Sequence, residues 1–119
     1  MCSSDLADPR AGLRILLCHY PEVVDALSGG AFQLVLAGHV HDGQICLPLP
    51  GGRKLRCAHP RARYPHGIYH GPGGVLHVSA GLGTTFVPFR FCARPEATLL
   101  VLQAEEEPGG GPEIGRAHV

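Results

Sequence analysis

Two histidines, His39 and His41, stand two residues apart directly after the apolar run of residues 32–37. Two imidazoles at this spacing in a tight loop can point into one small volume, and neutral imidazole is a good ligand for zinc, iron and manganese. Gly38 would let the backbone turn sharply there without a Cβ clash. The pattern predicts a metal site, although a pair of turn histidines bonded to carbonyl groups would give the same spacing.

A third histidine, His19, follows another short apolar run at residues 13–18. Each run is short enough for a buried strand. Pro21 suits the first turn of a helix between the two strands. Because the carboxyl ends of adjacent parallel strands meet at one edge of a sheet, we expect His19 to lie beside the loop of His39 and His41. A lone histidine at a strand end is usually a capping or surface residue, so the combination carries the prediction.

The remaining elements are expected to be mostly strands. Short apolar or β-branched segments separated by turn residues indicate strands at 45–49, 75–79, 85–91 and 97–102. Residues 50–74 are rich in Gly, Pro, Arg and His, and they are too many for a plain connection. This segment is interpreted as an ordered loop or a hairpin. The order strand, helix, strand, followed by strands, predicts a β-rich α/β fold.

Composition limits the possible partners. The 119 residues are 45% hydrophobic and 17% charged, with a formal net charge of zero, which is the balance of one globular domain. The basic residues are scattered, so nucleic acid is not expected as a partner. Apolar runs are far shorter than the roughly 20 residues that cross a bilayer. The five cysteines show no metal-binding spacing and are interpreted as reduced core residues.

Both ends of the chain resemble translated sequencing adapter. Residues 2–6, CSSDL, and residues 113–119, EIGRAHV, back-translate to a common short-read adapter and its reverse complement. We therefore expect residues 1–6 and 113–119 to be adapter artefacts, 7–104 to be the domain and 105–112 to be a polar tail. Ordinary polar tails are the alternative. His118 is not counted among the candidate ligands.

The domain resembles a known family over residues 13–102. The stretches LLCHYPEVVDAL, FQLVLAGHVHDGQICLP and RARYPHGIYHGPGGVLHVSAGLGTTFVPFRFCARPEATLLVL are similar to the C-terminal half of calcineurin-like metallophosphoesterases. The closest likeness is to bacterial membrane-associated or lipid-linked phosphohydrolases. The resemblance implies the C-terminal portion of a four-layer α/β/β/α sandwich, with metals at the strand ends.

The resemblance also implies a ligand set and a reaction. His19 and His39 would bind one divalent ion and His41 a second, with manganese, iron or zinc as candidates. Such a pair of ions hydrolyses phosphate esters by activating water and polarising the phosphoryl group. The expected substrate is a phosphomonoester or phosphodiester, lipid-linked or nucleotide. Peripheral membrane association of a full-length protein and a cytoplasmic or membrane-associated location are expected, and the sequence does not indicate an oligomeric state.

Other parts of the family pattern do not occur in the sequence. The family has an Asp-x-His, a bridging Asp and an Asn-His pair before this region, whereas the sequence contains no Asn. We therefore expect a truncated hydrolase that supplies three ligands, no catalytic residue and no activity in isolation. The alternative is a non-catalytic, β-rich metal-binding module in which the three histidines hold one structural ion.

Several polar residues near the motif receive weaker predictions. Asp42 is expected either to accept a hydrogen bond from a ligand imidazole or to be an exposed turn residue. Gln44 is expected to be structural. The segment 50–74 contributes His59, His66 and His70, for which we expect surface positions, with contact to substrate as the alternative.

Overall fold

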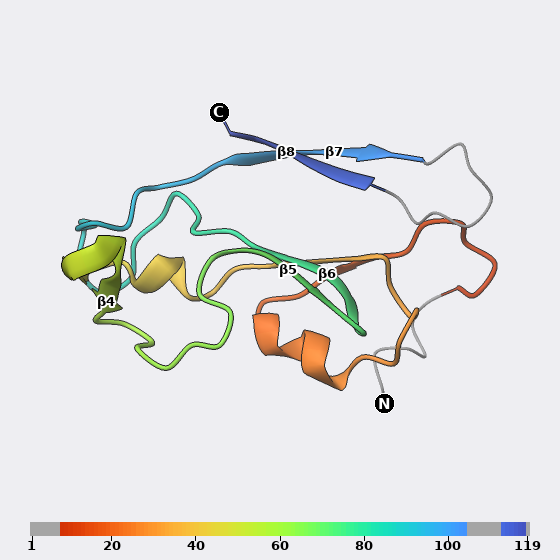
Figure 1. Ribbon diagram of the computed structural model, residues 1–119, viewed down its shortest axis with the longest axis horizontal. Coiled ribbons are helices and arrows are strands. Elements are labelled where there is room, and N and C mark those ends of the chain that lie inside the picture. The colour runs from red at the N-terminus through yellow and green to blue at the C-terminus, as the bar shows by residue number, and fades with distance from the viewer. Residues whose placement is uncertain (1–7, 105–112, 119) are drawn as a thin grey trace.

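The computed structural model describes residues 8–104 and 113–118, and its centre is a four-stranded mixed sheet (Figure 1). The strands are β1 (Ile15–Leu17), β2 (Leu34–Ala37), β6 (Gly74–Val78) and β5 (Gly67–Gly71), in that spatial order. β1 pairs in parallel with β2, and β2 pairs in parallel with β6. β5 joins β6 as an antiparallel hairpin. The parallel pairing expected for the first two strands is confirmed.

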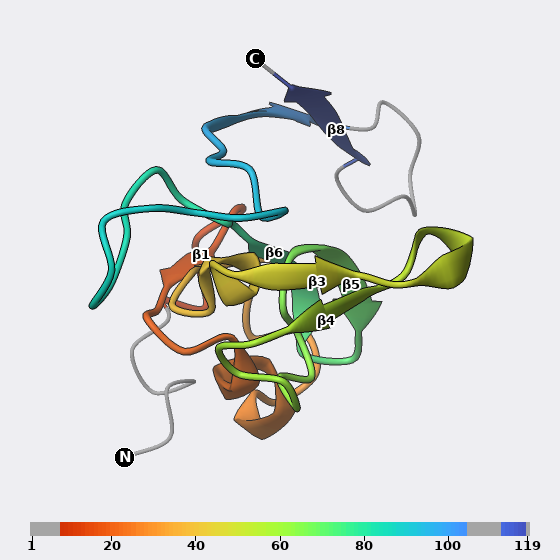
Figure 2. The same ribbon diagram turned by 90° about the vertical axis from the view of Figure 1, so that its left-hand side faces the viewer.

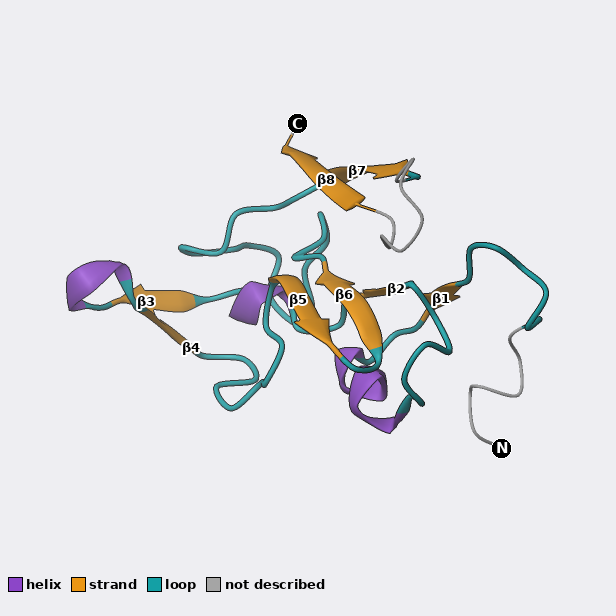
Figure 3. Ribbon diagram, turned by 45° about the vertical axis from the view of Figure 1, so that its right-hand side comes forward, coloured by secondary structure: helices purple, strands orange, loops and turns teal. Residues whose placement is uncertain are grey.

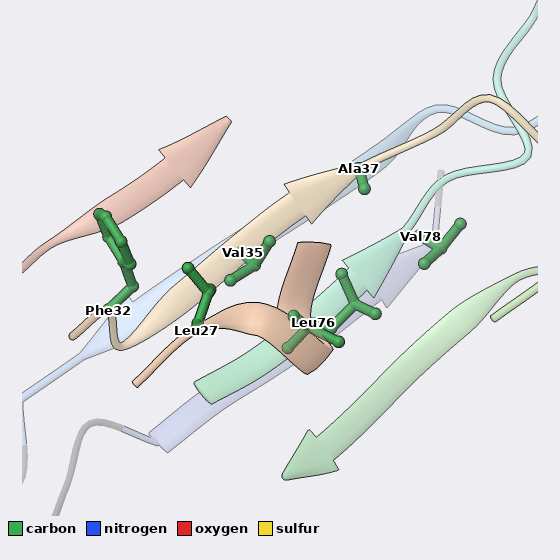
Figure 4. Close-up of a cluster of buried hydrophobic side chains, with 7 residues drawn as sticks. Leu27, Phe32, Val35, Ala37, Leu76 and Val78 are labelled. Atoms are coloured by element: carbon green, nitrogen blue, oxygen red, sulfur yellow. The ribbon is translucent and has the colours of Figure 1, made fainter. Parts of the chain in front are cut away.

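One face of this sheet packs against the 3-10 helix η2 (Pro21–Ala26). Buried side chains from η2, β2 and β6 meet there, and Val35 and Val78 are completely buried (Figure 4). The predicted helix does begin at Pro21, where the missing N–H group has no helical partner to lose. It extends for only 6 residues, however, as a 3-10 helix. The core cluster comprises Val24, Leu27, Phe32, Val35, Ala37, Leu76 and Val78.

The opposite side of the sheet faces a two-stranded ribbon, as Figures 1 and 3 show. It consists of β7 (Thr98–Gln103) and β8 (Glu113–His118), paired antiparallel from Thr98 opposite His118 to Gln103 opposite Glu113. Alternate residues of β7 are half-buried, as expected for a strand with one covered face. Figure 3 shows the ribbon, the sheet and η2 as successive layers.

A second hairpin projects from the sheet. It is formed by β3 (Cys46–Pro48) and β4 (Lys54–Arg56), and the short helix η4 (Pro50–Gly52) closes its tip. A third short helix, η3 (His41–Gly43), precedes β3. The hairpin interpretation of segment 50–74 is therefore confirmed for its first part, and the β5–β6 hairpin occupies its end. No helix in the described ranges is long and apolar enough to cross a membrane.

Two expectations about the elements need correction. Residues 85–91 form no strand, and only a single bridge joins Phe91 to Ile45. β1 is not a buried strand, because it lies at the edge of the sheet and leaves Leu17 75% exposed. The helices among the described residues are short 3-10 helices, so the fold is β-rich with a mixed sheet, whereas the four-layer sandwich stays a prediction.

The domain boundaries also stay predictions. Residues 1–6 and 105–112 lie outside the described residues, as does Val119. Pairing of β8 with β7 does not test whether residues 113–119 come from an adapter.

Leu76→Ala should destabilise the domain strongly. Leu76 is 1% exposed within the core cluster, so truncation leaves a cavity that costs about 2–5 kcal/mol of unfolding free energy. Leu82→Ala is the matched control, because Leu82 is 70% exposed and the same change there should alter stability by no more than about 0.5 kcal/mol. Urea unfolding followed by circular dichroism measures both, and equal losses would contradict the assigned core.

Candidate metal centre

His19 and His39 follow the carboxyl ends of two paired strands. β1 and β2 run parallel with Leu17 opposite Leu36, and the Gly38 N–H donates a hydrogen bond of 3.4 Å to the His19 carbonyl. The ring centroids of His19 and His39 are 4.6 Å apart. The predicted convergence of these two imidazoles is therefore present, and it arises from the parallel register of the two strands.

The backbone after β2 takes an unusual left-handed path. Positive φ angles occur at His39 (71°), His41 (52°), Asp42 (51°) and Gln44 (53°). Left-handed backbone costs a residue with a Cβ roughly 1–2 kcal/mol. Such conformations persist where surrounding structure holds them, and they cluster at functional sites.

The glycine that this path requires is not the expected one. Gly38 does not have a positive φ, and a Cβ there would meet only the Ser79 carbonyl at 3.9 Å. Gly43 has φ 85°, and a Cβ there would lie 2.6 Å from Cβ of Arg56. The predicted role of Gly38 in a sharp turn is therefore wrong, because Gly43 is the position where the turn packs against β4.

Gln44 anchors the turn to the loop that follows β6. Its side-chain amide donates to the carbonyl groups of Thr85, Val87 and Phe89 at 3.0, 3.0 and 3.2 Å. Its Oε1 accepts the Thr85 N–H at 2.7 Å, and Gln44 is 5% exposed. These bonds hold residues 85–89 around one side chain and direct their carbonyl groups inward, which explains why this β-prone segment does not pair as a strand. The structural role expected for Gln44 fits this arrangement.

The histidines open onto a pocket of about 650 Å³. His19, His39 and His41 all line it, so the three histidines predicted as ligands border one pocket, and their role as ligands stays a prediction. Figure 2 looks onto this end of the molecule, where the β3–β4 hairpin and the loop after β6 extend. Ile45, Phe86 and Val87 supply apolar parts of the wall.

The environment of the pocket favours uncharged imidazoles. Burial lowers the pKa of His39 below its ordinary value, and the neighbouring His59 and His19 lower it further, while Glu22 opposes the shift. Burial also lowers the pKa of His41, assisted by the Arg90 guanidinium and opposed by a hydrogen bond with Gln44. Neutral imidazole is the form that binds a metal ion. Nδ1 of His41 is buried without a hydrogen-bond partner in the described part of the chain.

These residues fit a transition metal in the chemistry of their donors. A nitrogen-only set, with a lowered pKa at His39 and at His41 and with one buried nitrogen of His41 lacking a hydrogen-bond partner in the described part of the chain, suits borderline metals such as zinc. Within residues 8–104 and 113–118, however, no three His, Cys, Asp or Glu side chains form a group that could hold an ion as they stand. The rings of His19 and His39 are neighbours, and the three imidazoles would have to reorient around a metal.

Asp42 has neither of its predicted roles. It is 3% exposed, and its carboxylate accepts hydrogen bonds from Lys54 Nζ and, at 2.9 Å, from Arg56 Nε. Both partners lie on β4, so the ion pairs join the left-handed turn to the hairpin. A buried carboxylate takes such partners because an unpaired charge there is costly.

The histidines of segment 50–74 differ in their surroundings. His66 lies 2.6 Å from a carboxylate oxygen of Glu96, measured from Nε2, and His70 is exposed on β5. His59 lines the pocket, and its ring centroid is 4.6 Å from that of His39. The surface position expected for His59 therefore coincides with the rim of the site. Its spacing in the sequence gave no signal of this contact, because the intervening hairpin determines where it lies.

Comparison with known proteins relates this sequence to metallophosphoesterases. The sequence is 36% identical over 91 residues to the uncharacterized metallophosphoesterase YkuE of Bacillus subtilis, covering 76% of this chain and 31% of that protein. It is 38% identical over 90 residues to an uncharacterized metallophosphoesterase of Helicobacter pylori, covering 74% of this chain and 23% of that protein. The chain is homologous to part of these metallophosphoesterases. No family model and no solved structure matches it significantly.

Metallophosphoesterase homology covers most of this chain but little of each relative. A second Bacillus subtilis protein, the uncharacterized metallophosphoesterase YkoQ, is 30% identical over 87 residues and is matched over 32% of its length. The chain therefore spans about a quarter to a third of the curated metallophosphoesterases that it matches. The resemblance inferred from the sequence motifs is confirmed at this level.

Gln44→Glu should release the loop that forms one wall of the pocket. A carboxylate cannot donate to the three carbonyl groups, and at this buried position it would place a negative charge against their oxygen atoms, which is costly. Gln33→Glu is the matched control, because Oε1 of Gln33 only accepts the Arg14 N–H at 2.7 Å and a carboxylate would still accept it. Hydrogen exchange of residues 85–91 should rise in the first variant alone. Unchanged protection there would contradict the anchoring role of Gln44.

Proposed function

We propose that this chain is the metal-binding portion of a dinuclear metal-dependent phosphoesterase. The observation that carries the proposal is the meeting of His19 and His39, 4.6 Å apart at adjacent strand ends, in a pocket that His41 also lines. Homology to part of bacterial metallophosphoesterases supports it. The residues that would hold the metals are His19 and His39 for one ion and His41 for the other.

Each part of the pocket has a task in this proposal. The strand ends and the left-handed turn hold the three imidazoles on one side, and burial lowers the pKa of His39 and of His41, which favours the uncharged form that donates a lone pair to a metal ion. Ile45 and Val87 are half-buried and give the pocket an apolar lining, which Phe86 continues at the exposed surface. When bound, two such ions activate a water molecule and stabilise charge on a phosphoryl group.

The substrate we propose is a phosphomonoester or phosphodiester, lipid-linked or nucleotide. The chain supplies no identified acid or base for the leaving group, and it spans only part of its relatives. Turnover would therefore need the remaining segments that those relatives contain, and the isolated chain should be inactive.

Replacing His39 with Ala should reduce metal uptake. Removing an imidazole that binds an ion should weaken Mn²⁺ or Zn²⁺ binding by at least about tenfold, which is the effect of losing even an outer partner of a ligand. Mass spectrometry under native conditions and isothermal titration give the stoichiometry and affinity. His70→Ala is the control, because His70 is exposed on β5 and does not line the pocket. Equal binding by both variants would argue against the site.

Hydrolysis requires a longer polypeptide that joins this segment to the rest of its relatives' length. There, His39→Ala and His41→Ala should each lower phosphodiesterase turnover by orders of magnitude, while two ions bind per unaltered chain. One tightly held ion without turnover would instead support a structural metal module.

A further inference from the structure

The segment that leaves the β3–β4 hairpin is fastened to the left-handed turn by its backbone. The Cys57 N–H donates to the Ile45 carbonyl at 2.8 Å, and the Ala58 N–H donates to the Gly43 carbonyl at 3.3 Å. Cys57, Ala58 and His59 then line the same pocket as the three candidate ligands. The hairpin therefore returns the chain to the site after leaving the sheet.

Charged side chains reinforce this attachment. The buried carboxylate of Asp42 binds Lys54 and Arg56, and the side chain of Arg56 lies so close to Gly43 that no Cβ fits between them. The position of residues 57–59 is thus determined by the turn that carries His39 and His41, and not by the hairpin alone.

His59 has a left-handed backbone, and its ring lies beside that of His39. Its φ of 53° is left-handed. For a residue that carries a Cβ this conformation is unfavourable, and it persists only where the surrounding structure holds it. Its ring centroid lies 4.6 Å from that of His39 at an interplanar angle of 60°. His19 lies on His39 at 4.6 Å and 59°. His59 is therefore as near to the His39 ring as His19 is, although it meets that ring edge-on, as Tyr20 also does.

We propose that His59 is a further nitrogen donor to the metal site, supplied by the segment that leaves the β3–β4 hairpin, in addition to His19, His39 and His41. The proposal rests on the proposed metal-binding function and extends it to a residue outside the strand-end motif. Its consequence is that an ion bound at His39 also contacts the hairpin. Metal binding should then restrain residues 57–59 as well as the turn.

Cobalt binding to the 119-residue chain tests the proposal without any need for turnover. His59→Asn removes the imidazole, while Asn tolerates the left-handed backbone at this position. We expect the affinity for Co²⁺, measured by visible absorption and by competition with Zn²⁺, to fall by about tenfold or more. His70→Asn makes the same change at an exposed histidine away from the pocket and should bind as the unaltered chain does.

A second variant reports contact directly. His59→Cys places a thiolate, which binds Co²⁺ and Zn²⁺ well, where the imidazole was. It should add a thiolate-to-cobalt charge-transfer band in the near ultraviolet, above any contribution from the native cysteines. His70→Cys should add none. Circular dichroism of all four variants checks that each is folded.

The outcomes separate the two proposals. If the unaltered chain binds no Co²⁺, the proposed metal site is itself wrong. If the unaltered chain binds Co²⁺ while His59→Asn binds equally well and His59→Cys adds no charge-transfer band, the metal site stands and the role of His59 is overturned. Weaker binding in His59→Asn together with the new band in His59→Cys supports the proposal.

Discussion

The parallel pairing of β1 with β2 is the constraint on which the candidate site depends. Side chains after two neighbouring parallel strands meet at one edge, and here the register places His19 beside His39. The pairing leaves β1 with one neighbour, so Leu17 is exposed while β2 is largely buried. The site therefore follows one largely buried strand and one edge strand of the sheet.

The strained turn after β2 is the second element, and its stability comes from distant parts of the chain. Gln44 binds the loop after β6, Asp42 binds β4, and Arg90 donates to the His41 carbonyl at 3.2 Å. A typical hydrogen bond contributes about 0.5–1.5 kcal/mol, and one to a charged group about 1.5–3 kcal/mol. Contributions of this size are comparable with the cost of left-handed backbone at individual residues. The loop after β6, strand β4 and the left-handed turn after β2 thus stabilise one another.

Sequence patterns predict the parts of the site that depend on residues adjacent in the chain. Short apolar runs indicated β1 and β2, and the histidines directly after them indicated where two rings would meet. Residues 85–91 were misread because Thr, Phe and Val favour strands. Their backbone is instead bound to Gln44, which lies about forty positions earlier in the chain, and no local pattern reports such a contact. Asp42 was misread for the same reason, since its partners lie on β4.

His59 shows what a strand-end motif alone leaves out. The motif places histidines after neighbouring strands at one edge of the sheet. Donors from one edge would approach an ion from one side. A hairpin that leaves that edge and returns can add a donor from another direction, provided that its return is fixed. Here the backbone bonds of Cys57 and Ala58 and the ion pairs of Asp42 fix it. These contacts join the hairpin to the left-handed turn after β2, and not to the hydrophobic core that packs against η2. A shift of that turn, which carries His39 and His41, would therefore also shift His59.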